Sequence, residues 1–188
     1  MTGATGNESA GRTRVERLDS DALDEGAVAE LGDVLHACVD GGASVGFVPP
    51  FGVADARRYW RDVRGSLVSG GRVLLVARQD GRITGTAQVM LAMPANGRHR
   101  ADVGKVLVHP AARRSGLGRA LMAEVERVAL EHGRSLLVLD TVTDSAGERL
   151  YQAIGYRAAG VIPGYALSTR GTLEDTRVMF KVLPPISG

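Results

Sequence analysis

Residues 106–122 carry the clearest structural signal in the sequence, and they read Val106-Leu107-Val108-His109-Pro110-Ala111-Ala112-Arg113-Arg114-Ser115-Gly116-Leu117-Gly118-Arg119-Ala120-Leu121-Met122. A short β-branched run, typical of a strand, stops at Pro110 and gives way to a basic turn with two glycines. Apolar residues then recur at near-helical spacing as far as residue 132, with charged residues on another face. The stretch predicts a strand, a basic glycine turn and a helix in direct succession.

The turn between this strand and this helix has the features of an anion site. Free backbone N–H groups at a helix start, together with the positive end of the helix macrodipole, favour a phosphate. Gly116 and Gly118 have no Cβ, so a ligand can approach the backbone closely. Arg113, Arg114 and Arg119 add positive charge. We expect a phosphorylated ligand here, the alternative being a tight turn with solvated arginines.

The spacing Arg113-x-x-Gly116-x-Gly118 narrows the kind of ligand. A Walker loop ends in Gly-Lys-Ser/Thr and a dinucleotide fingerprint needs three glycines, so this turn is neither. Following an apolar strand, it resembles the acyl-CoA pyrophosphate loop of the GNAT acetyltransferase superfamily, Arg/Gln-x-x-Gly-x-Gly/Ala.

Length and composition favour one ordinary globular domain. The 188 residues are 44% hydrophobic and 23% charged, which is enough to bury a sizeable core. The formal net charge is only +2 and the arginines are scattered, so a nucleic-acid partner is not expected. The single cysteine, Cys38, excludes an internal disulfide and a cysteine-rich metal site, and we expect it to be a small buried residue. The His, Cys and Asp residues lack metal-ligand spacing, so no metal is predicted.

The chain contains no apolar run that approaches the ~20 residues needed to cross a bilayer. The N-terminal segment is rich in Thr, Gly, Ser and Asn and has no hydrophobic core region, so it does not resemble a secretory signal. We expect residues 1–12 to be a disordered tail, residues 13–188 to form the domain, and the protein to be cytoplasmic without a membrane partner.

Hydrophobic periodicity predicts the element order βααβββαβαββ in a single α/β domain with a mixed central sheet. The predicted strands are 13–18, 72–78, 83–91, 101–108, 135–141, 156–161 and 176–183. The predicted helices are 20–40, 56–67, 117–132 and 145–154. Ser145-x-x-Glu148 is a capping box that opens the last of these helices, with Ala146, Leu150 and Ala153 expected on its core face.

This order looks like the GNAT fold, and the resemblance covers roughly residues 12–183. Further segments resemble the tabtoxin-resistance acetyltransferases within that superfamily. They are Gly41-Gly42-Ala43-Ser44-Val45-Gly46-Phe47, Arg100-Ala101-Asp102-Val103, Leu139-Asp140-Thr141, Leu150-Tyr151-Gln152-Ala153 and Pro163-Gly164-Tyr165. One departure is Asp102, because that family has Glu at this position, and the shorter side chain alters the reach of the carboxylate.

The resemblance implies an N-acetyltransferase that moves the acetyl group of acetyl-CoA to the amine of a small, amino-acid-like metabolite or toxin. Acetyl-CoA would be a co-substrate, with no metal. The residues expected to bind it are Val106, Leu107, Val108, Arg113, Arg114, Ser115, Gly116, Leu117, Gly118, Arg119, Ala120 and Tyr151.

Acetyl transfer to an amine needs a base for the amine proton, donors for the carbonyl oxygen and an acid for the departing thiolate. Asp102, on the strand before the basic turn, is the expected base, unless it is a solvated residue paired with Arg100. Asp140, at a strand end, either binds the substrate ammonium, serves as the base, or caps a turn. The resemblance implies that Tyr151 is the general acid, the alternative being a packing tyrosine. Cys38 has no base partner, so direct attack by the amine is expected.

Two other functions stay open at this level. One is a protein N-acetyltransferase, which would need an open groove. The other is a non-catalytic module that binds acyl-CoA, against which Asp102 and Tyr151 argue. A homodimer is also left open.

Overall fold

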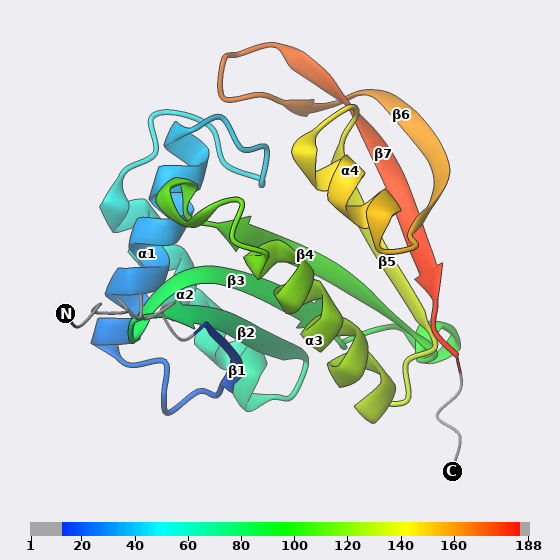
Figure 1. Cartoon of the computed structure of the whole chain (residues 1–188), viewed down its shortest axis with the longest axis horizontal. Coiled ribbons are helices and arrows are strands. Elements are labelled where there is room, and N and C mark those ends of the chain that lie inside the picture. The colour runs from blue at the N-terminus through cyan, green and yellow to red at the C-terminus, as the bar shows by residue number, and fades with distance from the viewer. Residues whose placement is uncertain (1–12, 185–188) are drawn as a thin grey trace, which may run out of the picture.

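A computed structural model describes residues 13–184 of the chain, and the elements there follow the predicted order (Figure 1). Their bounds are β1 Arg14–Leu18, α1 Glu25–Asp40, α2 Val53–Val68, β2 Arg72–Gln79, β3 Arg82–Met90, β4 Arg100–Val108, α3 Leu117–Glu131, β5 Leu136–Val142, α4 Ala146–Ala153, β6 Arg157–Leu167 and β7 Leu173–Val182. Short 3₁₀ turns cover Ala95–Gly97 and Pro110–Ala112. The expected disordered tail, residues 1–12, lies outside the described residues.

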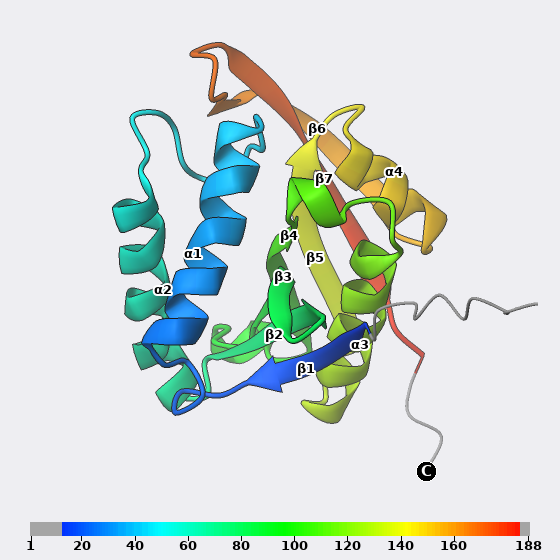
Figure 2. The same cartoon turned by 60° about the vertical axis from the view of Figure 1, so that its left-hand side comes forward.

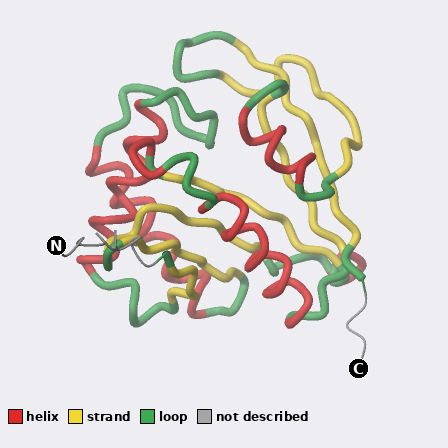
Figure 3. The backbone as a smooth tube through the Cα atoms, viewed as in Figure 1, coloured by secondary structure: helices red, strands yellow, loops and turns green. Residues whose placement is uncertain are grey.

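All seven strands belong to one sheet, in the order β1-β2-β3-β4-β5-β7-β6. Every neighbouring pair is antiparallel except β4 and β5, which are parallel and are joined by the crossover helix α3. Figures 2 and 3 show α1 and α2 on one face of the sheet, with α3 and α4 on the other. This is the predicted α/β domain with a mixed central sheet.

The parallel pair holds together over a short distance only. Its register joins Arg100–Asp102 of β4 to Leu136–Val138 of β5, and beyond these residues the two strands have no paired positions. Each strand continues with its other neighbour, β4 with β3 and β5 with β7. The sheet therefore opens between the carboxyl halves of β4 and β5.

A bulge in β4 changes which face of the sheet its side chains reach. Lys105 has a positive φ of 49°, and the register between β3 and β4 shifts between Thr86 and Gln88. Before the bulge, Val103 packs in the core under α3, whereas Leu107 after it packs in the core under α1 and α2. An extra residue in one strand has this effect because side-chain direction alternates with period two.

Two sequence predictions need correction. The first long helix begins at Glu25 rather than near residue 20, because Asp24 is the N-cap and accepts a hydrogen bond from the Ala27 amide at 2.8 Å. On α4 the buried residues are Glu148 and Tyr151, whereas Ala146 and Ala153 are exposed. Glu148 is buried there because Arg177 pairs with it, a partner that helical periodicity does not reveal.

Candidate active site

A cavity of about 1080 Å³ lies where β4 and β5 diverge. Its walls come from β4 after residue 102, the basic turn, the end of β5, the start of α4, the loop after α1, and the β6–β7 hairpin. Ten of the residues that the sequence predicts for cofactor binding line it. They are Val106, Leu107, Val108, Arg113, Arg114, Gly116, Leu117, Gly118, Arg119 and Tyr151.

The basic turn at one end of the cavity has the geometry of an anion site. Gly116 is the N-cap of α3 and has a φ of 84°, a left-handed conformation that glycine adopts without steric cost. A Cβ built on Gly116 meets nothing within 4 Å, so the space above its backbone is open. The first N–H groups of α3 have no acceptor within the helix, so they are available to donate hydrogen bonds to an anion.

Two predicted contacts do not belong to the lining. The hydroxyl of Ser115 donates to the carbonyl of Ala112 at 2.7 Å, which stabilises the turn itself. The amide of Ala120 donates to the Gly116 carbonyl, one helical turn into α3. His109 also has a structural role, because its Nδ1 accepts a hydrogen bond from the Ala111 amide at 3.2 Å.

The edge of β4 that faces the cavity is free of strand partners within the described part of the chain. Residues 103–108 pair only with β3, because β5 has left the sheet register after residue 102. The Val108 carbonyl accepts hydrogen bonds from Cys38 Sγ at 3.4 Å and from Arg113 Nε at 3.3 Å. The other backbone N–H and C=O groups on this edge need acceptors and donors. An extended ligand can supply them by lying along β4 as an added strand.

Tyr151 reaches the cavity from the buried face of α4. The N-cap Ser145 accepts a hydrogen bond from the Glu148 amide at 3.1 Å, as the predicted capping box requires. The Glu148 carboxylate turns back to the Asp144 amide at 2.7 Å, one residue before the cap. Tyr151 is 7% exposed, and burial, followed by the negative charge of Asp140, raises its pKa to about 12. Its hydroxyl therefore remains a proton donor at neutral pH.

Asp140 lines the same cavity from β5. Within residues 13–184 its carboxylate takes part in no hydrogen bond and no ion pair, so it does not cap a turn there. Its charge acts on Tyr151 and on Lys105, which identifies both as electrostatic neighbours. Asp140 is thus a free carboxylate inside the candidate site.

Asp102 lies outside the cavity lining. It sits in the paired part of β4, opposite Val138 of β5 and Met90 of β3. Its Oδ1 is 2.8 Å from Nη1 of Arg100, and its side chain is 42% exposed. The structure therefore shows the paired strand residue that the sequence left open as the alternative, and this placement does not support the role expected for Asp102.

Lys105 is a cavity residue that the sequence reasoning missed. Its Nζ lies 5.4 Å from the ring centroids of both Phe47 and Tyr59. In the sequence, Lys105 is marked only as a charged residue within the apolar run 103–108. A lysine does not indicate a β-bulge, so its position in the cavity could not be predicted. The glycine-rich segment 41–46 also lines the cavity, although it was noted only for its resemblance to a family.

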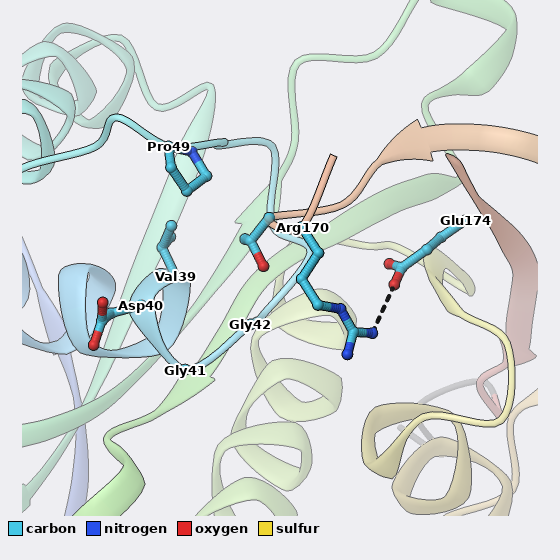
Figure 4. A pocket seen from close by; sticks show the side chains of 8 residues that line it. Val39, Asp40, Gly41, Gly42, Pro49, Arg170 and Glu174 are labelled. Carbon is cyan, nitrogen blue, oxygen red and sulfur yellow. Dashed lines mark ion pairs between the residues drawn. The ribbon is translucent and has the colours of Figure 1, made fainter. Parts of the chain in front are cut away.

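A smaller hollow of about 500 Å³ adjoins the cavity and shares Gly41, Gly42 and Glu174 with it (Figure 4). It lies between the loop after α1 and the β6–β7 turn. Arg170 and Glu174 form an ion pair at 3.8 Å beside it. The cavity and this hollow therefore adjoin between the loop after α1 and the β6–β7 turn.

Within residues 13–184 no three His, Cys, Asp or Glu side chains gather as a metal site. Nor does this part of the chain contain a helix long and apolar enough to cross a membrane.

The chain is similar to three known proteins. An uncharacterized N-acetyltransferase of Azospirillum brasilense, encoded in the hisH–hisA intergenic region, is 38% identical over 130 residues, which cover 67% of this chain and 73% of that protein. The yncA protein of Salmonella typhimurium, solved with its cofactor acetyl-CoA, has a TM-score of 0.74 at 19% identity, covering 94% of this chain and 97% of that one. A ribosomal-protein-alanine N-acetyltransferase from Brucella melitensis has a TM-score of 0.72 at 21% identity, with 90% and 99% covered.

Because these two solved structures are only 19% and 21% identical to this chain, the comparison with them shows a common fold and no more. The profile of the Acetyltransferase (GNAT) family matches residues 44–156, a range that holds β2 to α4 and most of the cavity wall. The chain belongs to the GNAT acetyltransferase family.

Proposed function

We propose that this protein transfers the acetyl group of acetyl-CoA to the amine of a small, amino-acid-like acceptor. The single observation that carries the proposal is that four kinds of functional group line one cavity. It combines an anion-binding helix start, an unpaired strand edge, a buried phenol and a free carboxylate. A related fold, that of yncA, was solved with acetyl-CoA.

The chain offers a complete set of groups for this co-substrate. The N-terminus of α3, with Arg113, Arg114 and Arg119, would hold the pyrophosphate. The free edge of β4 at Val106–Val108 would bind the extended pantetheine arm. Bound in this way, the co-substrate supplies an activated acyl group near the divergence of β4 and β5.

The residues at that point can carry the proton transfers. Asp140 accepts a proton from the amine as it attacks the thioester carbonyl. Backbone N–H groups on the free edge of β4 stabilise the charge that develops on the carbonyl oxygen. The hydroxyl of Tyr151 then protonates the departing sulfur. The C–S bond breaks, an amide bond forms, and free CoA leaves as the thiol.

The likeness to tabtoxin-resistance enzymes supports the acceptor class. The segment 41–46, which carries part of this sequence resemblance and lies outside the common cofactor motif, lines the cavity. An amino-acid-like toxin or metabolite is therefore our proposed acceptor. The protein N-acetyltransferase alternative has its own support in the fold shared with the Brucella melitensis enzyme.

Release of free thiol from acetyl-CoA tests the proposal. Purified protein is assayed with free amino acids, simple amines, and short peptides with free N-termini, and the acetylated product is confirmed by mass spectrometry. We expect turnover with amino-acid-like amines. Turnover with peptides alone would favour the protein N-acetyltransferase, and acetyl-CoA binding without turnover would favour the non-catalytic module.

A further inference from the structure

Lys105 places a positive charge in the wall of the cavity. It follows Gly104 at the bulge of β4, and the bulge directs its side chain to the loop after α1 and to α2. Its Nζ lies 5.4 Å from the ring centroids of Phe47 and Tyr59, the two aromatic residues that flank it. These distances are within the range of cation–π contacts, which offset part of the cost of removing the ammonium from water.

A second cation lies behind Lys105. Arg72 of β2 donates through Nη1 to Oε1 of Gln88 at 2.8 Å, and the Tyr59 hydroxyl donates to the same oxygen at 3.1 Å. Burial lowers the pKa of Lys105, and the charge of Arg72 lowers it further. The two cations are therefore close enough to repel each other.

Neither cation has a carboxylate partner among the described residues. The ion pairs within 4.0 Å include neither Lys105 nor Arg72. The buried Nε of Arg72 and the buried Nε2 of Gln88 have no hydrogen-bond acceptor. Asp140 is the one acid whose charge favours the ammonium of Lys105, and it lies outside ion-pair distance. Unpaired buried donors and uncompensated charge are costly, so an anion bound beside Lys105 would stabilise this group.

We propose that Lys105, supported by Arg72, binds the carboxylate of the acceptor, while Asp140 in the same cavity receives its amine. Lys105 and Asp140 both line the cavity, with Arg72 outside its lining, and a cation with a separate carboxylate is complementary to a zwitterionic α-amino acid. The inference rests on the proposed function and makes it more specific, because it assigns the residues that select acids over other amines. An acceptor without a carboxylate would leave Lys105 and Arg72 without a carboxylate partner, as in the free protein.

The experiment compares amino acids with their carboxamides, which keep the amine and the side chain but lack the charge. Thiol release gives kcat/KM for each pair with wild type, Lys105→Met and Lys181→Met. Methionine keeps most of the aliphatic stem. Lys181, the other lysine of the sequence, pairs with Glu126 and lies outside the cavity lining, so it is the matched control.

We expect wild type and Lys181→Met to prefer the acid, and the preference to fall roughly 10- to 100-fold in Lys105→Met, the range for a lost charge-assisted hydrogen bond. An unchanged preference in Lys105→Met overturns the inference, as does a wild type that accepts acid and carboxamide equally. A Lys105 that merely holds Phe47 and Tyr59 in place would lower the melting temperature without changing the preference.

If none of the amines is acetylated, the proposed function fails and the subsite is tested by binding. Calorimetry then measures N-acetyl amino acids against N-acetyl amino acid amides, with CoA present. Tighter binding of the acids that is lost in Lys105→Met supports the subsite, and equal or absent binding of both overturns it.

Discussion

The phenol of Tyr151 and the carboxylate of Asp140 line one cavity, and the charge of Asp140 adds to burial in raising the pKa of Tyr151 to about 12. The interaction keeps the phenol protonated while Asp140 lacks any partner of its own among residues 13–184. A protonated group and a free carboxylate in one site are the two partners that acid–base catalysis needs.

Removing the hydroxyl of Tyr151 is expected to lower turnover with little change in folding. Tyr151→Phe keeps the ring that packs 5.8 Å from Tyr156, so the melting temperature should stay close to that of wild type. Turnover should fall by roughly 10²–10⁴, the range for a lost general acid. The loss should shrink with acyl donors that release more acidic thiols. Equal losses with all donors would indicate a positioning role, and no loss would make Tyr151 a packing residue.

A comparison of two carboxylates identifies the base. Asp140→Asn should lower kcat by roughly 10²–10⁴, because Asp140 lines the cavity. Asp102→Asn should change kcat far less, since Asp102 is paired with Arg100 outside the lining. Steady-state kinetics at saturating acetyl-CoA measures both. The reverse order would restore Asp102 to the role that its position in the sequence predicts.

Stability should decline in alkali because buried phenols resist ionisation. Burial raises the pKa of Tyr151 and Tyr156 above the ordinary value of 10.0, and Tyr151 reaches about 12. The folded protein holds these protons more tightly than the unfolded chain does. The contribution of Tyr151 is complete below pH 10 and is lost as the pH rises through about 12, whereas that of Tyr156 is lost only at higher pH. Urea denaturation at about pH 8 and about pH 11 should show a smaller decline in Tyr151→Phe. The exposed Tyr165→Phe should decline like wild type, and identical declines in all three would contradict the assignment.

The buried ion pair on α4 should contribute to folding. The side chain of Glu148 is 5% exposed, and its Oε1 lies 2.5 Å from Nε of Arg177. Glu148→Gln leaves Arg177 without its charge partner and should lower the free energy of unfolding by about 2 kcal/mol. Glu124→Gln, which breaks the more exposed pair with Arg127, should cost at most about 1 kcal/mol. Equal costs in denaturant titrations would show that burial of the Glu148 pair adds nothing.

The sequence predicted the parts of the molecule that depend on local signals. The element order, the glycine turn before α3 and the capping box at Ser145 all follow from residues close together in the chain. The residues of the basic turn could be found for the same reason, because a helix start and its preceding strand are consecutive.

The parts that depend on pairing between distant strands could not be predicted in this way. Asp102 and Asp140 each lie on a strand, but only the register of β4 with β5 determines which of them faces the opening. Lys105 owes its position to a bulge with positive φ, which lysine rarely adopts and does not signal. The buried face of α4 depends on Arg177 of β7, far along the chain.

Binding of acyl-CoA at the start of α3 is central to the proposed function, and calorimetric titration with acetyl-CoA tests it most directly. Wild type should bind, and Gly116→Asp should bind at least about 10-fold more weakly, because its carboxylate would occupy the open space above Gly116 meant for the pyrophosphate. Gly116→Asn is the matched control. It has nearly the same size and the same tolerance of the left-handed backbone, so it should retain most of the affinity. A wild type that does not bind acetyl-CoA, or a folded Gly116→Asp that binds it as tightly as Gly116→Asn, would contradict the assignment.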